Sequence, residues 1–289
     1  MRRRRDPLVA ASQRGTGLWG TRTRLRRRSR GTLAHAEAST ACGGANVVRA
    51  DGARAGRAHV LGILGGMGPL ATADFYRRLV ERTPATRDQE HLPVVIWADP
   101  GVPDRTAALV ERAPSPLPAL VEGARRLRRA GATVVAVPCN TAHAFIAPVA
   151  KAAGVEVLDM VGAAMREAVR LAVGGGGVGV LATNGTRAAR LYERAAPAAV
   201  EVVQVRADVQ RDCVDAAIGL VKGGGDLGVA AELIADATRE LRRQGAEVAV
   251  AACTEIPLVS GAAMRVLPVL DSTDALVDAA LVRMGRLPA

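Results

Sequence analysis

Two cysteines in matching sequence surroundings are the residues of this chain best suited to chemistry. The segment from Arg125 to Cys139 (RRLRRAGATVVAVPC) aligns without a gap with the segment from Arg239 to Cys253 (RELRRQGAEVAVAAC), 114 residues further on, and 8 of the 15 positions are identical. In both segments an apolar, valine-containing run ends at the cysteine, and polar residues typical of helix starts follow. A single cysteine in a strand is usually a small buried hydrophobe. Two at equivalent places favour an internal duplication with a functional thiol in each half.

Paired thiols of this kind suit the inversion of a carbon centre. If the two halves face each other across a pseudo-two-fold axis, one thiolate removes a proton from one face of a substrate and the other thiol donates a proton to the opposite face. An unperturbed thiol has a pKa of about 8.5. We therefore expect helix dipoles or nearby cations to lower the thiol pKa, and fixed donors to stabilise the carbanion.

The elements that must position these thiols follow a regular alternation of strands and helices. The runs predicted as strands begin at His59, Leu92, Ala132 and Val155 in the first half, and at Val178, Glu201, Val248 and Val266 in the second. This alternation predicts βαβ units with parallel sheets. We expect an α/β fold of two pseudo-symmetric three-layer lobes, residues 59–165 and 166–289, with the active-site cleft between them.

The net charge of +11 resides in the N-terminal extension. Residues 1–58 contain 14 Arg and 3 acidic residues, whereas the remainder contains 25 basic and 25 acidic residues. Low apolar periodicity predicts that residues 1–58 are disordered. A basic arm for nucleic acid or a membrane surface is one interpretation; an organellar presequence or an over-extended start is the other, and the one we favour.

The cysteine count and the apolar runs indicate the compartment. The four cysteines (Cys42, Cys139, Cys213 and Cys253) are widely spaced and form no metal-ligand or disulfide pattern, which favours a reducing cytosol. Gly or charged residues interrupt every apolar run before it reaches the length of a bilayer. We therefore expect a cytoplasmic protein with no membrane span and no metal site.

Three motifs resemble those of the cofactor-independent aspartate/glutamate racemase family. They are Gly65-Gly66-Met67-Gly68-Pro69, Pro138-Cys139-Asn140-Thr141-Ala142-His143 and Cys253-Thr254-Glu255-Ile256-Pro257-Leu258. The resemblance runs from about Val60 to about Leu281 and departs from the family at Ala252, where Gly is usual. It implies a homodimeric amino-acid racemase that needs neither pyridoxal phosphate nor metal, with Cys139 and Cys253 as its two acid/base thiols.

Candidate substrate-binding residues surround these motifs. Arg105 lies in a Pro-Asp-Arg-Thr loop after a predicted strand, and a guanidinium pairs well with a carboxylate. Lys222 is one of two lysines and lies in a predicted glycine loop, where the alternative is a solvated surface lysine. The resemblance implies that both hold a distal carboxylate. It implies that the α-carboxylate and ammonium pocket is lined by Met67, Asn140, Thr141, Thr254 and Glu255.

Several alternatives stay open at this level. Asn140, Thr141 and Thr254 suit plain helix capping, and His143 either polarises the Cys139 thiol or has a structural role. The runner-up function is a related two-thiol isomerase or decarboxylase that acts on a maleate- or malonate-type acid. Two alternatives belong to other functional classes. One is a ligand-binding regulator whose Arg-rich arm binds nucleic acid in a salt-sensitive way, and the other is a thiol-redox role for the two cysteines.

Overall fold

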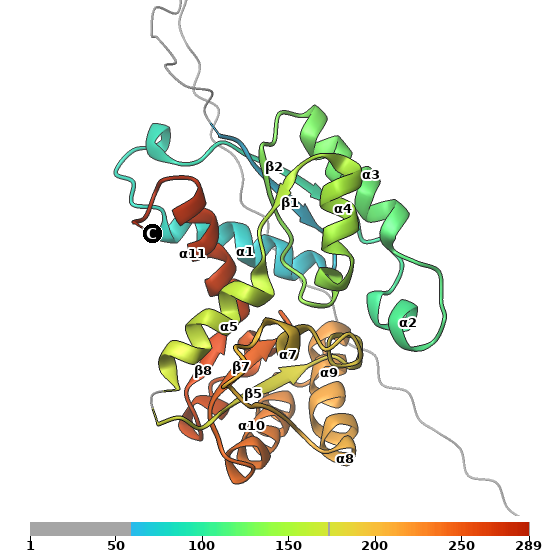
Figure 1. Ribbon diagram of the computed structural model, residues 1–289, viewed down its shortest axis with the longest axis vertical. Coiled ribbons are helices and arrows are strands. Elements are labelled where there is room, and N and C mark those ends of the chain that lie inside the picture. Colours follow the sequence, from blue (N-terminus) through green and yellow to red (C-terminus); the bar gives the residue numbers. More distant parts are fainter. Residues whose placement is uncertain (1–58, 173, 289) are drawn as a thin grey trace, which may run out of the picture. The chain divides into compact units, whose positions relative to one another are not determined.

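Two parallel four-stranded sheets form the framework of the folded chain (Figure 1). The computed structural model describes residues 59–172 and 174–288, so the prediction for residues 1–58 lies outside the described residues. The first sheet has the order β2-β1-β3-β4 and the second β6-β5-β7-β8, with every pairing parallel. The strands of the first sheet are β1 (Leu61–Gly65), β2 (Val94–Ala98), β3 (Val134–Ala136) and β4 (Glu156–Val157), and those of the second are β5 (Gly177–Ala182), β6 (Val202–Gln204), β7 (Ala246–Ala252) and β8 (Val269–Asp271). Because the two orders are equivalent, the predicted α/β fold with duplicated halves is confirmed.

Helices cover both faces of each sheet. The larger helices are α1 (Pro69–Arg82), α3 (Leu117–Arg129), α4 (Ile146–Ala153), α5 (Met160–Leu171), α10 (Leu227–Arg243) and α11 (Ser272–Arg283). The shorter ones are α2 (Arg105–Val110), α6 (Asn184–Ala188), α7 (Leu191–Ala195), α8 (Ala207–Val209) and α9 (Ala216–Gly223). Successive strand residues point to opposite faces: in β1, Leu61 and Ile63 pack with α1, whereas Leu64 packs with α3. The predicted three-layer arrangement follows from this alternation.

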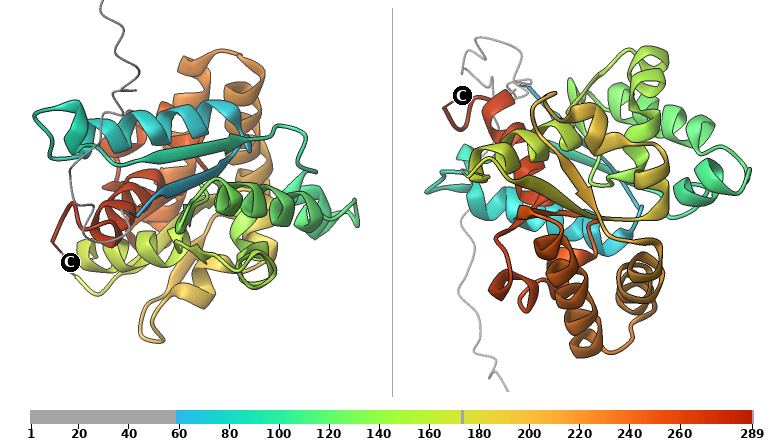
Figure 2. Two further views of the ribbon diagram at one scale, coloured as in Figure 1. Left: turned by 90° about the horizontal axis from the view of Figure 1, so that it is seen from above. Right: turned by 60° about the horizontal axis from the view of Figure 1, so that its bottom comes forward.

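Helices α5 and α11 connect the two halves. Helix α5 contributes Val161, Ala164 and Met165 to the core of the second sheet, whereas α11, at the end of the chain, contributes Leu276 and Leu281 to the core of the first. Figure 2 shows α11 (red) beside α1 (cyan), and α11 also packs on α5. The predicted division at residue 165 falls within α5, and the lobe limits stay a prediction.

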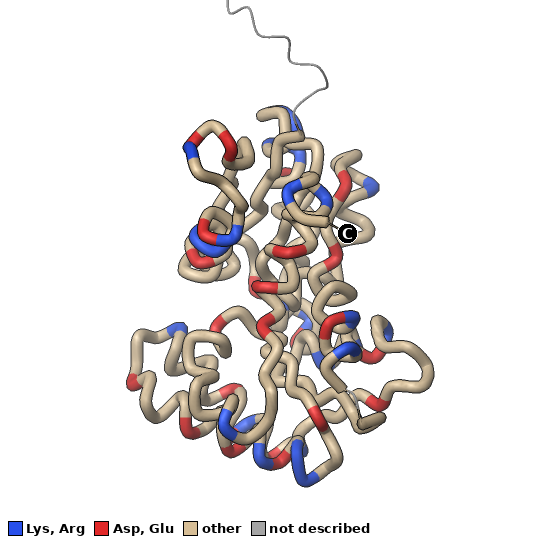
Figure 3. The backbone as a smooth tube through the Cα atoms, turned by 90° about the vertical axis from the view of Figure 1, so that its left-hand side faces the viewer, with Lys and Arg blue, Asp and Glu red and all other residues tan. Residues whose placement is uncertain are grey.

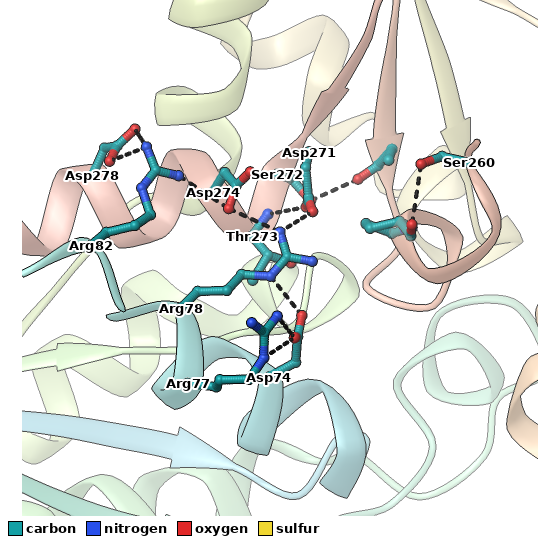
Figure 4. A network of polar contacts seen from close by, with 12 residues as sticks. Asp74, Arg77, Arg78, Arg82, Ser260, Asp271, Ser272, Thr273, Asp274 and Asp278 are labelled. Carbon is teal, nitrogen blue, oxygen red and sulfur yellow. Dashed lines mark hydrogen bonds and ion pairs between the residues drawn. The ribbon is translucent and has the colours of Figure 1, made fainter. Parts of the chain in front are cut away.

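An ion-pair cluster fastens α1 to the start of α11. Arg78 donates to Asp271 at 2.5 Å, to Asp274 at 2.9 Å and to Asp74 at 2.7 Å (Figure 4). Asp271 is the N-cap of α11 and accepts from the backbone N–H of Thr273. The first turn of α11 is thus held both by its own capping residue and by a cation from the first sheet's layer.

Charged residues of both signs are interspersed over the described part of the chain (Figure 3), which contains 25 basic and 25 acidic residues. Among the described residues, none of the helices has the length and apolar character needed to cross a membrane.

Candidate active site

One cavity brings together all nine residues singled out from the sequence. Twelve residues line it: Met67, Asp104, Arg105, Thr106, Cys139, Asn140, Thr141, Thr183, Lys222, Cys253, Thr254 and Glu255. The space not filled by atoms is about 330 Å³, its opening to solvent included. Cys139 comes from the first half and Cys253 from the second, so both thiols face one small polar cavity. The roles of these residues stay proposals, which are developed below.

The carboxyl ends of equivalent strands deliver the two thiols. Cys139 lies three residues beyond β3, in a tight turn where its backbone N–H donates to the Val137 carbonyl at 2.8 Å. Cys253 follows the last residue of β7 directly, and its carbonyl accepts from the Ile256 N–H at 3.0 Å. Each cysteine is 6% exposed. In an open α/β sheet this edge is where ligands bind.

The Cys253 thiol is protonated in this arrangement. Its Sγ donates to Oε2 of Glu255 at 2.9 Å. Burial raises the pKa of Cys253 well above its ordinary value, the charge of Glu255 and this hydrogen bond raise it further, and Lys222 opposes them. The expectation of a lowered thiol pKa is therefore wrong for Cys253, because desolvation and a neighbouring carboxylate disfavour the thiolate.

Asn140 and Thr141 bond across to the second half rather than capping a helix. The amide of Asn140 donates to Ser272 Oγ at 3.0 Å and accepts from the Tyr192 hydroxyl at 2.7 Å. The hydroxyl of Thr141 is 2.9 Å from that of Thr183 and 3.0 Å from that of Thr186. Asn140 occupies the N-cap position of the turn after Cys139, but its side chain makes no capping hydrogen bond to the backbone. The capping interpretation is therefore wrong for this residue.

Arg105 and Lys222 supply positive charge to the cavity. Arg105 is the first residue of α2, a helix capped by Asp104, where a loop was expected. Among the described residues its Nη1 makes only long contacts, 3.3 Å to the carbonyls of Val102 and Pro103, and its buried Nε has no partner there. Lys222 lies in the last turn of α9, not in the expected glycine loop. No carboxylate forms an ion pair with either residue in the described part of the chain.

His143 holds the backbone of Cys139 rather than its thiol. Its Nδ1 lies 2.9 Å from the Cys139 carbonyl, and the Met160 N–H donates to Nε2 at 3.2 Å. Since Nε2 accepts, Nδ1 carries the proton and donates to the carbonyl. Burial lowers the pKa of His143, which keeps the ring neutral. The structural interpretation of this histidine is the one that the contacts favour.

Sequence reasoning missed Asp104, Thr106 and Thr183, which also line the cavity. Thr183 had a signal: it follows β5 at the place where the glycine motif follows β1, so the duplication marks it. In the glycine motif, the Gly66 N–H donates to Thr72 Oγ1 at 2.9 Å.

Comparison with known proteins finds a matching family and similar structures. The sequence profile of Asp/Glu/hydantoin racemases matches residues 64–280. The chain is 25% identical over 223 residues to the broad specificity amino-acid racemase RacX of Bacillus subtilis. This alignment covers 74% of this chain and 93% of that protein. It is 31% identical to the aspartate racemase of Picrophilus torridus, with a TM-score of 0.67 over 78% of this chain and 94% of the other. The fold is shared with glutamate racemase RacE1 of Bacillus anthracis, at 18% identity and a TM-score of 0.61 over 80% of this chain and 84% of that one.

Proposed function

The chain belongs to the Asp/Glu/hydantoin racemase family, and we propose that it is an amino-acid racemase that interconverts L- and D-aspartate without a cofactor, by proton transfer at Cα between Cys139 and Cys253. One observation carries the proposal: a single cavity is lined by two thiols from separate sheets and by two cations that lack a carboxylate partner among the described residues. The similarity to an aspartate racemase supports the substrate, and that to a broad specificity racemase supports a range that extends to glutamate and other amino acids. By family resemblance we expect a cytoplasmic homodimer.

The protonation of Cys253 sets one direction of the reaction. With Cys253 as the thiol, Cys139 acts as the thiolate base: its sulfur takes the Cα proton, and the electron pair of the C–H bond remains on Cα and the adjoining carboxylate. The Cys253 S–H bond then breaks and its proton forms the new C–H bond on the opposite face. The enzyme ends with the two protonation states exchanged, from which the reverse reaction starts.

The other cavity residues divide between the two ends of the substrate. Arg105 and Lys222 pair with the distal carboxylate. Asn140, Thr141 and Thr254 supply donors for the α-carboxylate, where negative charge develops as the proton leaves. The Glu255 carboxylate suits the ammonium group, and Met67 provides an apolar wall. Lys222 also offsets the cost of a thiolate at Cys253, whose pKa it lowers.

Deuterium incorporation at Cα tests the proposal. Each enantiomer of aspartate is incubated in D2O with the native chain, Cys139→Ser, Cys253→Ser and, as a matched control, Cys213→Ser, whose thiol is not among the residues that line the cavity. We expect the native chain and the control to racemise both enantiomers, and both active-site variants to lose racemisation. Arg105→Met and Lys222→Met should lose turnover of aspartate with both thiols intact. An inactive native chain, or full racemisation by either single-cysteine variant, contradicts the two-thiol racemase.

A further inference from the structure

A buried hydrogen-bonded chain connects the segments that bear the two thiols. The Tyr192 hydroxyl donates to Asn140 Oδ1 at 2.7 Å, Asn140 Nδ2 donates to Ser272 Oγ at 3.0 Å, and Ser272 Oγ donates to the Ala251 carbonyl at 2.7 Å. Tyr192, Asn140 and Ser272 are each at most 2% exposed. Asn140, within this chain, is the residue after Cys139, and Ala251, at its end, lies two residues before Cys253.

The members of this chain come from different layers of the fold. Asn140 follows β3 of the first sheet, whereas Tyr192 lies on α7 and packs in the core of the second sheet. Ser272 is the first residue of α11, next to Asp271, which Arg78 holds (Figure 4). Because each partner is anchored in its own core, the amide of Asn140 is held from two sides.

The hydrogen bonds also determine which way the amide faces. Burial raises the pKa of Tyr192, so its hydroxyl keeps the proton and acts as a donor to an oxygen. Ser272 donates to a carbonyl, so it accepts from the amide nitrogen. Both contacts require the same amide orientation, and they leave one Nδ2 hydrogen of Asn140 uncommitted on a residue that lines the cavity.

We propose that Tyr192 and Ser272 are positioning residues for racemisation: they fix the Asn140 amide so that its free N–H, not its oxygen, meets the substrate carboxylate beside Cys139. The inference rests on the proposed racemase function. Without the Tyr192 hydroxyl, Oδ1 loses its partner and the amide is free to turn, which brings an oxygen toward a carboxylate. Because charge on that carboxylate increases in the transition state, the loss affects kcat more than KM.

Tyr192→Phe and Ser272→Ala test the assignment, since each removes a hydroxyl and keeps most of the packing. Removing one preorganised donor to developing charge typically costs about 100-fold or more in kcat, and a donor left in place but misoriented should cost about tenfold or more. We expect KM for aspartate to change less than about threefold in both variants. The matched controls are Tyr76→Phe, the other tyrosine, 40% exposed, and Ser260→Ala, whose hydroxyl donates to the Pro257 carbonyl; both should keep native kcat.

A double-mutant cycle separates positioning from general packing. In an Asn140→Ala background, which retains both thiols, Tyr192→Phe should cause no further loss of Cα deuteration, because the amide through which it acts is gone. The inference is overturned if Tyr192→Phe and Ser272→Ala keep native kcat. It is also overturned if Tyr192→Phe lowers Cα deuteration equally in the native and the Asn140→Ala backgrounds. In either case an active native chain leaves the proposed racemase function intact. Ser272→Ala provides the independent measurement if Tyr192→Phe does not fold. If the native chain does not racemise, it is the proposed function that fails.

Discussion

Replacing Glu255 by Gln should lower the pKa of Cys253, so that more of this thiol is ionised at a given pH. The Glu255 carboxylate accepts the Cys253 proton at 2.9 Å, and its charge and hydrogen bond are, after burial, the main causes that raise the pKa of Cys253. Gln removes the charge and offers an N–H that favours a thiolate. The variant should therefore shift the Cys253 equilibrium toward the ionised form.

The expected size of this shift follows from the distance between the Cys253 sulfur and the Glu255 carboxylate. Two unit charges about 4 Å apart, a distance that allows for the delocalised carboxylate, interact by roughly 4 kcal/mol at an effective dielectric constant of about 20. Retaining even a third of that energy, about 1.4 kcal/mol, changes an equilibrium tenfold. At a fixed pH below its titration midpoint, the thiolate fraction of Cys253 should rise about tenfold or more.

The ionised fraction of Cys253 is measured from the ultraviolet absorbance of the thiolate as a function of pH. The measurement uses a variant in which Cys253 is the only thiol, because Cys42, Cys139 and Cys213 are replaced by Ser. Glu240→Gln is the matched control, because Glu240 is a buried carboxylate on α10 that pairs with Arg206 and Arg243. It should leave the titration unchanged. Lys222→Met should move the midpoint upward, since Lys222 lowers the pKa of Cys253. An unchanged or higher midpoint in Glu255→Gln would refute the assignment of Cys253 as the thiol held by Glu255.

Two further predictions concern the packing around the cavity. A Cβ at Gly185 would lie 2.8 Å from Thr106 Cα and 2.8 Å from Thr141 Cγ2, so Gly185→Ala should destabilise the chain by about 1–3 kcal/mol in urea unfolding and lower kcat. Gly219→Ala, also helical but with no neighbour within 4 Å of its Cβ, should be neutral or stabilising; equal effects at both sites would contradict the tight contact. Burial depresses the pKa of His143, so its contribution to stability is fully present above the unfolded-state pKa of about 6.5 and is lost as pH falls from there through the folded-state pKa. His143→Gln should weaken this acid-side decline in the free energy of unfolding, measured by urea titration near pH 5 and near pH 8; an unaltered pH dependence would show that another group causes it.

The fold was predictable because its signals are local. The apolar runs at β1, β2, β5 and β7 mark strands, and the repeated Gly-Ala before β3 and β7 reveals the duplication. The misread positions are those where tertiary contacts decide. Helix α2 is a short helix of six residues that follows a proline-rich stretch, and Asp104 caps it. Arg190, between α6 and α7, adopts φ 50, a conformation that residues other than Gly rarely adopt.

The residues of the candidate site were predictable where they adjoin the duplicated cysteines, and not where they reach the cavity from elsewhere. Asn140 and Glu255 are sequence neighbours of the thiols, so the motifs identify them. Tyr192 contacts Asn140 across 52 residues of sequence, and its surroundings, Leu191 to Ala195, read as an ordinary helix. Nor does sequence indicate that Glu255 raises the pKa of Cys253, because that depends on how a turn directs the carboxylate.

The exchange of helices between the halves explains why both thiol segments can be held so firmly. Without α11, the first half would lose Leu276, Ala280 and Leu281 from the core that they share with β1 and α1. Without α5, the second sheet would expose the face covered by Val161 and Met165. Neither half can then bury its own sheet, so the two cores must form together. The cavity is lined by residues of both halves, and the packing that holds the halves together therefore also fixes the positions from which the two sulfur atoms approach a substrate.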